Sequence, residues 1–433
     1  MVRVVSFEGS WQVVKSKWRW WLGQIVRRIW FRATLFSMAG VVTALLAVAL
    51  SPYIPQELPT KIGADAVDKI LGIIASSMLT VTTFSLTTMV SAYSAATTNV
   101  TPRATKLVIE DSTTQNVLAT FVGSFLFSLV GIIALTTGAY GDRGRLILFV
   151  VTIGVIVLII VTLLRWIDHL SRLGRVTETT ERVERTTIEA LTAWVETPNL
   201  GGHRLLEGDP RLGKPNSPIH QNEVGYVQHV DATLLSEIAE EFDFDICIVA
   251  IAGKLVAPNT PLAWVDGEVH DNVYERIASA FTIGNVRSFD QDPRFGAAVL
   301  SEIASRALSP AVNDPGTAID VISRAIRVLS VWDLQDSKIK VVYPRLFVTP
   351  IRLEDLFDDL FVPIARDGAS IIEVGLRLQK AFLTLSKFGD VEFKKIAMLH
   401  ATSALKRAEA TAMIDEDLAR LRHTAALLSK NLS

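Results

Sequence analysis

An uncharged stretch from Ile70 to Thr98 constrains this chain more than any other feature. As an α-helix it reaches about 43 Å, more than the roughly 30 Å hydrocarbon core of a bilayer. The stretch is nonetheless rich in hydroxyl side chains, and seven of them fall within an arc of roughly 80° on a helical wheel. They are Ser76, Thr80, Thr83, Thr87, Ser91, Ser94 and Thr98. A membrane helix with such a stripe faces either a close-packed neighbour or water.

Both orientations of this hydroxyl stripe have support in the sequence. Small residues that would allow close helix packing recur in the apolar stretch 117–137, at Thr120, Gly123, Ser124, Ser128 and Gly131. A water-filled conduit is favoured by the length of the stripe, about six turns, and because hydroxyls partly replace hydration without binding an ion tightly. Phe84 lies at the edge of the stripe, where it is either a hydrophobic constriction or a packing residue.

The overall composition places this stretch among several membrane spans. The chain has 433 residues, of which 49% are hydrophobic, and the apolar excess lies in the first 165. A transmembrane domain over residues 33–165 is predicted to contain four spans, at 33–50, 70–98, 117–137 and 146–164. None has a charged residue or histidine in its middle. Ion-coupled carriers and pumps usually need such groups at depth, so these classes are disfavoured, as are intramembrane proteases and metal enzymes.

Residues 1–32 form a basic, Trp-rich segment with a net charge of +6. Mixed Trp and Arg is typical of chain lying in the lipid headgroup layer, as an anchor or as a specific lipid site. The predicted membrane-interface anchors are Trp18, Arg19, Trp20, Trp21, Arg27, Arg28 and Trp30. The positive charge predicts a cytoplasmic N-terminus, and four spans return the C-terminus to the cytoplasm. No cleavage motif follows, so the segment is not read as a cleavable signal.

The rest of the chain reads as cytosolic. We predict a helical stalk at 166–197, in which an apolar repeat continues the helix of the last span toward Glu196. A linker at 198–222, a small α/β domain at 223–270 and a mainly α-helical domain at 271–433 follow. The net charge of −2 gives no indication of nucleic-acid binding. The single cysteine, Cys247, excludes an intrachain disulfide and fits a reducing compartment. We find no phosphate-loop, dinucleotide, zinc-protease or serine-hydrolase motif, and therefore expect no enzyme, cofactor or metal.

One cytosolic run, residues 288–321, has an unusual pattern. Asp292-Pro293 and Asp314-Pro315 each precede a helical pattern, which is typical of an N-cap followed by a first-turn proline. Alternatively, pairing of the two helices would gather the polar residues into a ligand or ion pocket. That candidate pocket consists of Asp290, Gln291, Asp292, Asn313 and Asp314.

Several runs resemble a known family. They are Gly225-Tyr226-Val227-Gln228, QDPRFG at 291–296, RALSPAVNDPGTA at 306–318, and Thr101-Pro102-Arg103 after the hydroxyl-rich span. Together they are similar to the bacterial predicted membrane protein family called domain of unknown function 2254, over nearly the whole chain from about residue 33. The resemblance implies a multi-pass inner-membrane protein with a cytosolic C-terminal region, and it brings no activity or catalytic residue.

The sequence therefore predicts a bacterial inner-membrane protein whose function depends on the hydroxyl stripe. One helix cannot enclose a pore, so a conduit requires a homo-oligomer with these helices around an axis, passing small ions or solutes through the bilayer. The alternative is a membrane-anchored scaffold or sensor whose cytosolic region binds a partner or small ligand.

Overall fold

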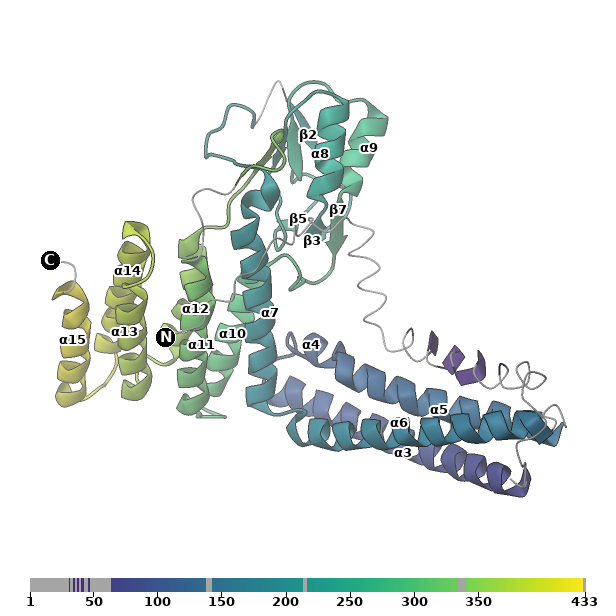
Figure 1. Ribbon diagram of the computed structural model, residues 1–433. Coiled ribbons are helices and arrows are strands. Elements are labelled where there is room, and N and C mark those ends of the chain that lie inside the picture. Colours follow the sequence, from purple (N-terminus) through teal and green to yellow (C-terminus); the bar gives the residue numbers. More distant parts are fainter. Residues whose placement is uncertain are drawn as a thin grey trace. The chain divides into compact units, whose positions relative to one another are not determined.

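The computed structural model describes residues 64–137, 142–212, 216–333 and 340–430, together with scattered residues between 31 and 46 (Figure 1). The protein is mostly helical, with a mixed α/β region and a helical C-terminal part. It divides into two compact units, one of residues 21–179 and one that includes residues 180–433. We describe each unit by itself.

The first unit is built of long apolar helices, several of them long enough to cross a membrane. Its helices are α3 (Ala64–Asn99), the short α4 (Thr105–Ile109), α5 (Ser112–Thr136) and α6 (Asp142–Arg172). Among the described residues, three stretches are long and apolar enough to span a bilayer: Ala66–Thr98, Thr105–Thr136 and Arg145–Arg172. They contain the predicted spans 70–98, 117–137 (all but its last residue) and 146–164. The predicted span 33–50 lies largely outside the described residues, as do the predicted interface anchors.

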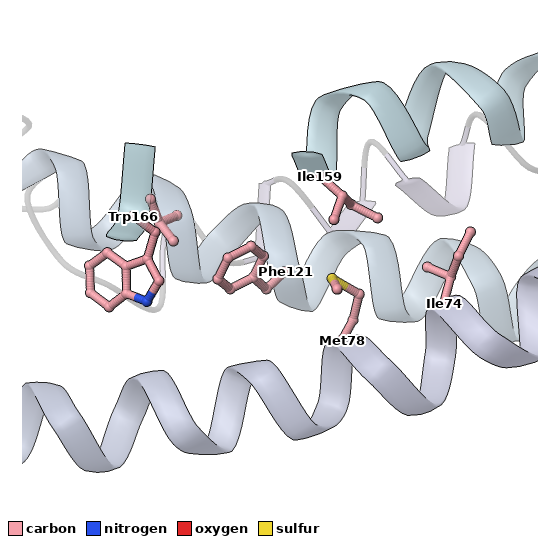
Figure 2. Packing of buried hydrophobic residues seen from close by; sticks show 6 residues of the cluster. Ile74, Met78, Phe121, Ile159 and Trp166 are labelled. Atoms are coloured by element: carbon pink, nitrogen blue, oxygen red, sulfur yellow. The ribbon is translucent and has the colours of Figure 1, made fainter. Parts of the chain in front are cut away.

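The three long helices share an apolar interior. Figure 2 shows its centre, where Ile74 and Met78 of α3 meet Phe121 of α5 and Ile159 and Trp166 of α6. A second cluster lies further along the same helices, around Val67, Leu71, Phe127 and Leu148. The helices therefore pack by side-chain interdigitation, which lipid cannot replace at the same density.

The predicted continuous helix from the last span to Glu196 is interrupted. α6 ends at Arg172 and α7 (Val176–Glu196) begins after Gly174, whose φ of 80° is in the left-handed region. The apolar repeat that predicted one helix continues through both segments, because each buries one face. The glycine, which adopts this backbone conformation at little cost, ends the first helix there.

The second unit contains two small sheets. Strands occur at β1 (His203–Arg204), β2 (Ser217–Ile219), β3 (Gly225–Val230), β4 (Ile246–Ile248), β5 (Leu255–Val256), β6 (Ala263–Val265), β7 (Phe281–Gly284) and β8 (Leu346–Val348). One sheet has the order β1-β8-β4-β6-β2 and the other β5-β3-β7. In the first, β8 runs parallel to β1 and β4, whereas β6 runs antiparallel to β4 and β2.

This first sheet draws strands from well beyond the predicted α/β range of 223–270. β1 and β2 come from the predicted linker, and β8 comes from the run KVVYPRLFVTP within the predicted helical part. Local pattern predicted a linker at β1 and β2, and these segments form strands because His203 pairs with Phe347 and Ser217 pairs with Val265, far away in sequence.

Helices complete the unit and form its C-terminal part. They are η2 (Pro198–Gly201), α8 (Ala232–Glu241), α9 (Asp271–Ser279), α10 (Pro293–Ala307), α11 (Pro315–Trp332), α12 (Leu353–Asp367), α13 (Ile372–Leu385), α14 (Val391–Glu409) and α15 (Asp415–Lys430). A buried ring cluster formed by Phe357, Phe361, Phe382 and Phe393 joins α12, α13 and α14.

Candidate functional site

The hydroxyl stripe of α3 lies on the free face of that helix. All seven stripe residues are exposed in the structure: Ser76, Thr80, Thr83, Thr87, Ser91, Ser94 and Thr98. The buried residues of α3, among them Leu71, Met78, Ser85 and Met89, lie on the opposite side of the helical wheel, about 180° away. The stripe is thus not part of the packing among the described helices of this unit.

This position removes one interpretation of the stripe. The small residues of α5 do pack closely, since a Cβ added at Gly131 would lie 3.0 Å from Leu71 Cδ1 of α3. Thr120, Ser124 and Ser128 are buried as well. The α5 contact seen at Gly131 is thus with the apolar face of α3, and the alternative in which the stripe itself packs against the third span is not what the described helices show. Periodicity identified the stripe but could not show which face of α3 the neighbour covers.

Large apolar side chains flank the stripe on both sides. Ile73 and Phe84 lie along one edge, and Leu79, Leu86 and Val90 lie along the other, all of them exposed. Phe84 is 64% exposed, so it is not a core residue of this unit. Its role as a constriction remains a prediction, because a constriction needs further copies of α3.

Four stripe hydroxyls, those of Ser76, Thr80, Thr83 and Thr87, are bonded to their own helix. Thr80 donates to the carbonyl oxygen of Ser76 at 3.0 Å, and Thr87 donates to that of Thr83 at 3.0 Å. Ser76 and Thr83 make similar bonds one turn back. Such bonding satisfies the hydroxyl proton where water is scarce, and it leaves the oxygen lone pairs directed outward.

Polar contacts join α6 to α3, at Ser85, and to the start of α5. Trp166 Nε1 donates to Ser85 Oγ at 2.9 Å, and the Trp166 ring stacks on His169. His169 Nε2 lies 2.9 Å from a carboxylate oxygen of Asp111, which also caps α5 through the backbone N–H of Thr114. These contacts hold the three helices together where the sequence predicted the cytoplasmic side.

The candidate pocket of residues 288–321 is divided between two places. Asp292 caps α10 through the backbone N–H of Phe295, and Asp314 caps α11 through that of Thr317. The backbone N–H of Asp314 donates to the carbonyl oxygen of Ala307 at the end of α10. The two caps are thus separated by the length of α10, about 22 Å for its 15 residues. The capping interpretation is confirmed for both aspartates.

The remaining candidate pocket residues have local contacts. Gln291 binds the backbone of Val230 in β3, where it accepts from the N–H at 2.9 Å. Asp290 accepts from the Ser288 hydroxyl, and Asn313 adopts a left-handed φ of 50° in the exposed loop before α11. Among the described residues, no group of three or more His, Cys, Asp or Glu side chains is placed to hold a metal ion. Burial raises the pKa of the Cys247 thiol to about 12, which keeps it protonated at neutral pH.

A model of the predicted membrane protein family DUF2254 matches residues 26–384. This chain belongs to that family. Relatives of this DUF2254 protein include uncharacterized proteins of Mycobacterium bovis and of two Mycobacterium tuberculosis strains, each 33% identical over 134 residues. That match covers 30% of this chain and 26% of each relative, so it spans about a quarter of their length. No solved structure matches the chain.

Two of the runs that carried the family resemblance, GYVQ and QDPRFG, lie together at strand β3. A Cβ at Gly225 of the GYVQ run would lie 2.8 Å from the Gly284 carbonyl oxygen, so β3 and β7 require a glycine there. Gln228 of the same run donates to the carbonyl oxygen of Val286 at 2.7 Å. Gln291, the first residue of the QDPRFG run, binds Val230 at the end of the same strand.

The QDPRFG run also contacts its surroundings through its charged and small residues. Arg287 forms a two-point ion pair with Asp292, at 2.7 and 2.8 Å. Arg294 pairs with Asp355 and Asp359 of α12. At Gly296, an added Cβ would lie 2.0 Å from the Thr187 hydroxyl of α7. These partners are 5 to more than 100 residues away in sequence, and the sequence pattern did not identify any of them.

Proposed function

We propose that this DUF2254 protein is a four-span bacterial inner-membrane channel. Several copies would surround an axis with the hydroxyl face of α3 inward, and both termini would be cytoplasmic. The permeating species would be small ions or solutes, and the cytosolic region would assemble and gate the channel without enzymatic activity. One observation carries the proposal: all seven hydroxyl-bearing positions are exposed on the face of α3 opposite its packed side.

The surroundings of the stripe support a conduit. Exposed apolar residues such as Leu79 and Val90 beside the stripe are suited to contact a neighbouring copy or lipid. The self-bonded hydroxyls tolerate a partly dry environment, and their free lone pairs can bind water or a passing ion weakly. The lack of charge from Ile70 to Thr98 fits passive conduction.

The test is a matched pair of variants in purified vesicles. Thr87 and Thr88 each donate a hydroxyl bond to the carbonyl oxygen four residues back, but only Thr87 lies in the stripe. Loss of a hydrogen bond of about 1 kcal/mol to the permeating species corresponds to roughly a fivefold change in flux. We expect Thr87→Val to change K⁺ or Cl⁻ flux to that extent, and Thr88→Val to have little effect. Absence of flux from the parent protein, or equal effects of both variants, contradicts the proposal.

Chemical labelling provides a second, independent measurement. Single cysteines along Ser76–Thr98, placed in a Cys247→Ala background, should react with a water-soluble thiol reagent with a period near 3.6 residues, as expected of a helix with one wet face. A stripe that stays unreactive in every condition would favour the scaffold or sensor.

The scaffold or sensor is the second candidate, and one observation favours it. Residues 310–314, in the middle of the RALSPAVNDPGTA run, form an exposed loop that includes Val312. Helix capping explains the presence of Asp314 in this loop, but it does not explain why the apolar side chain of Val312 is exposed there. Binding of a partner protein that is lost on Val312→Ser, in a protein without flux, would support this function.

A further inference from the structure

The junction between α6 and α7 is shaped by one glycine. α6 ends with the backbone N–H of Leu173 bonded to the carbonyl oxygen of His169, and Gly174 then takes a φ of 80°. α7 begins two residues later, at Val176. The segment Leu173–Arg175 is therefore a joint of only three residues between two helices.

This joint contacts the striped helix directly. A Cβ added at Gly174 would lie 3.3 Å from both the Cα and the Cβ of Ala92 in α3. The two backbones thus approach without an intervening side chain. Ala92 follows Ser91 and precedes Ser94 of the stripe. Closely packed backbones transmit displacement because no flexible side chain lies between them.

The middle of α7 is held by buried charge. Glu184 accepts from Arg324 Nη1 at 2.5 Å and from Arg327 Nη2 at 3.0 Å, both on α11. Glu184 and Arg324 are both buried, so the pair fixes the helix against α11. Thr187 packs against Gly296 of α10 one turn further on. From Thr180 onward α7 therefore belongs to the C-terminal unit, while its first turn belongs with the membrane helices.

We propose that α7 and the Gly174 joint form a coupling lever. Through this lever, the ion pairs that fix α7 to α11 set the conformation of α3 around Ala92. The lever regulates the stripe, and its importance for flux rests on the function proposed above. A ligand or partner that shifts α10 or α11 would act on α3 by this route, because α7 is a single helix that links these contacts to Gly174.

The test measures amide hydrogen exchange of residues 88–99 in the full-length protein in lipid nanodiscs. Arg327→Gln weakens the hold on α7 but leaves the Glu184–Arg324 pair in place. We expect exchange in residues 88–99 to change by about fivefold. Arg352→Gln is the control, because Arg352 and Arg327 are each 53% exposed and each pairs with a glutamate. It should leave the exchange of residues 88–99 as in the parent.

A second pair of variants addresses the joint itself. Gly174→Ala forces a methyl group toward Ala92, whereas Gly208→Ala places one at a similar φ of 76° with no atom within 4 Å. Only the first should alter exchange in residues 88–99. Unchanged exchange in α12–α15 verifies that each variant is folded, and if Gly174→Ala does not fold, the Arg327 and Arg352 variants decide.

The two proposals fail in different ways. Parent-like exchange of residues 88–99 in folded Arg327→Gln and Gly174→Ala overturns the lever, whatever the flux. Altered exchange together with no flux from the parent supports the coupling and overturns the channel. Altered exchange with a matching change in K⁺ or Cl⁻ flux supports both.

Discussion

Individual residues of this protein are explained by their immediate contacts. Gly296 lies within α10, directly after Phe295. By helix propensity alone, alanine at this position would make the helix more stable than glycine does. It faces Thr187, whose hydroxyl is already bonded to the carbonyl oxygen of Val183. The glycine is therefore required by the close approach of α10 to α7, and its backbone φ is not the reason.

We expect Gly296→Ala to lower the free energy of unfolding by about 1–3 kcal/mol, because the new methyl group overlaps Thr187 and the helices must separate. Gly154→Ala is the control, since Gly154 also lies within a helix and an added Cβ meets no atom within 4 Å. It should be neutral or stabilising by up to about 1 kcal/mol. Thermal unfolding in detergent measures both, and a Gly296→Ala protein as stable as the parent would show that the two helices are not in close contact.

At the scale of the element, α10 and α11 begin in the same way in sequence but differ in structure. Each has an aspartate N-cap followed by proline. The Asp314 carboxylate is exposed and accepts bonds from Thr317 in its own first turn. Asp292 is buried and also binds Arg287 at two points. The same motif is thus a local cap in one case and part of a tertiary ion pair in the other.

This difference predicts unequal costs of substitution. Asp314→Ala should cost about 0.5–2 kcal/mol, as for a lost cap. Asp292→Ala should cost about 3 kcal/mol or more, because it also leaves Arg287 without its carboxylate. Asparagine retains capping, so Asp314→Asn should be close to neutral while Asp292→Asn is not. Equal losses at the two positions, in urea unfolding of the full-length protein, would refute the distinction.

The Asp314 cap is also expected to depend on pH. Bonds from the Thr317 side chain and backbone N–H lower the pKa of Asp314 below its ordinary value. Because the folded state binds the proton more weakly, the cap stabilises the protein above that ordinary value, about 4, and its contribution is lost as the pH falls further. The stability difference between the parent and Asp314→Ala should therefore shrink below about pH 4.

At the scale of the whole molecule, α7 is the element on which the chain's organisation depends. It leaves the membrane helices at Gly174 and becomes part of the C-terminal unit from Thr180. Its buried Glu184 forms ion pairs with both Arg324 and Arg327. Removing one member of such a network lowers the free energy of unfolding strongly, because a buried charge loses its partner.

We expect Glu184→Ala to destabilise the C-terminal unit by about 3–5 kcal/mol. Arg324 would lose its buried partner, although it retains Asp320 one turn away. Adding Arg324→Leu to Glu184→Ala should restore much of the lost stability, since a buried apolar side chain needs no charged partner. Glu189→Ala, at an exposed position of α7, should change the stability by less than about 0.5 kcal/mol. Full stability of Glu184→Ala would refute the role of the pair.

The sequence alone determined features that depend on local pattern. The apolar spans from 70 to 164, the caps at Asp292 and Asp314, strand β3 and the C-terminal helices follow from residue type and periodicity, because these act over a few residues. The hydroxyl stripe is of this kind as well. It is a property of one helix, and helical geometry places its seven residues together whatever surrounds them.

Only the tertiary structure decided which face of each element is covered. It turned the hydroxyl stripe away from α5, divided the candidate pocket between the two ends of α10, broke the predicted stalk helix at Gly174, and paired Glu184 with arginines about 140 residues away. These outcomes depend on contacts between distant segments. The apolar face of α3 and its hydroxyl face both lie on one regular helix, and close van der Waals packing of the apolar face against α5 and α6 selected the side that is packed.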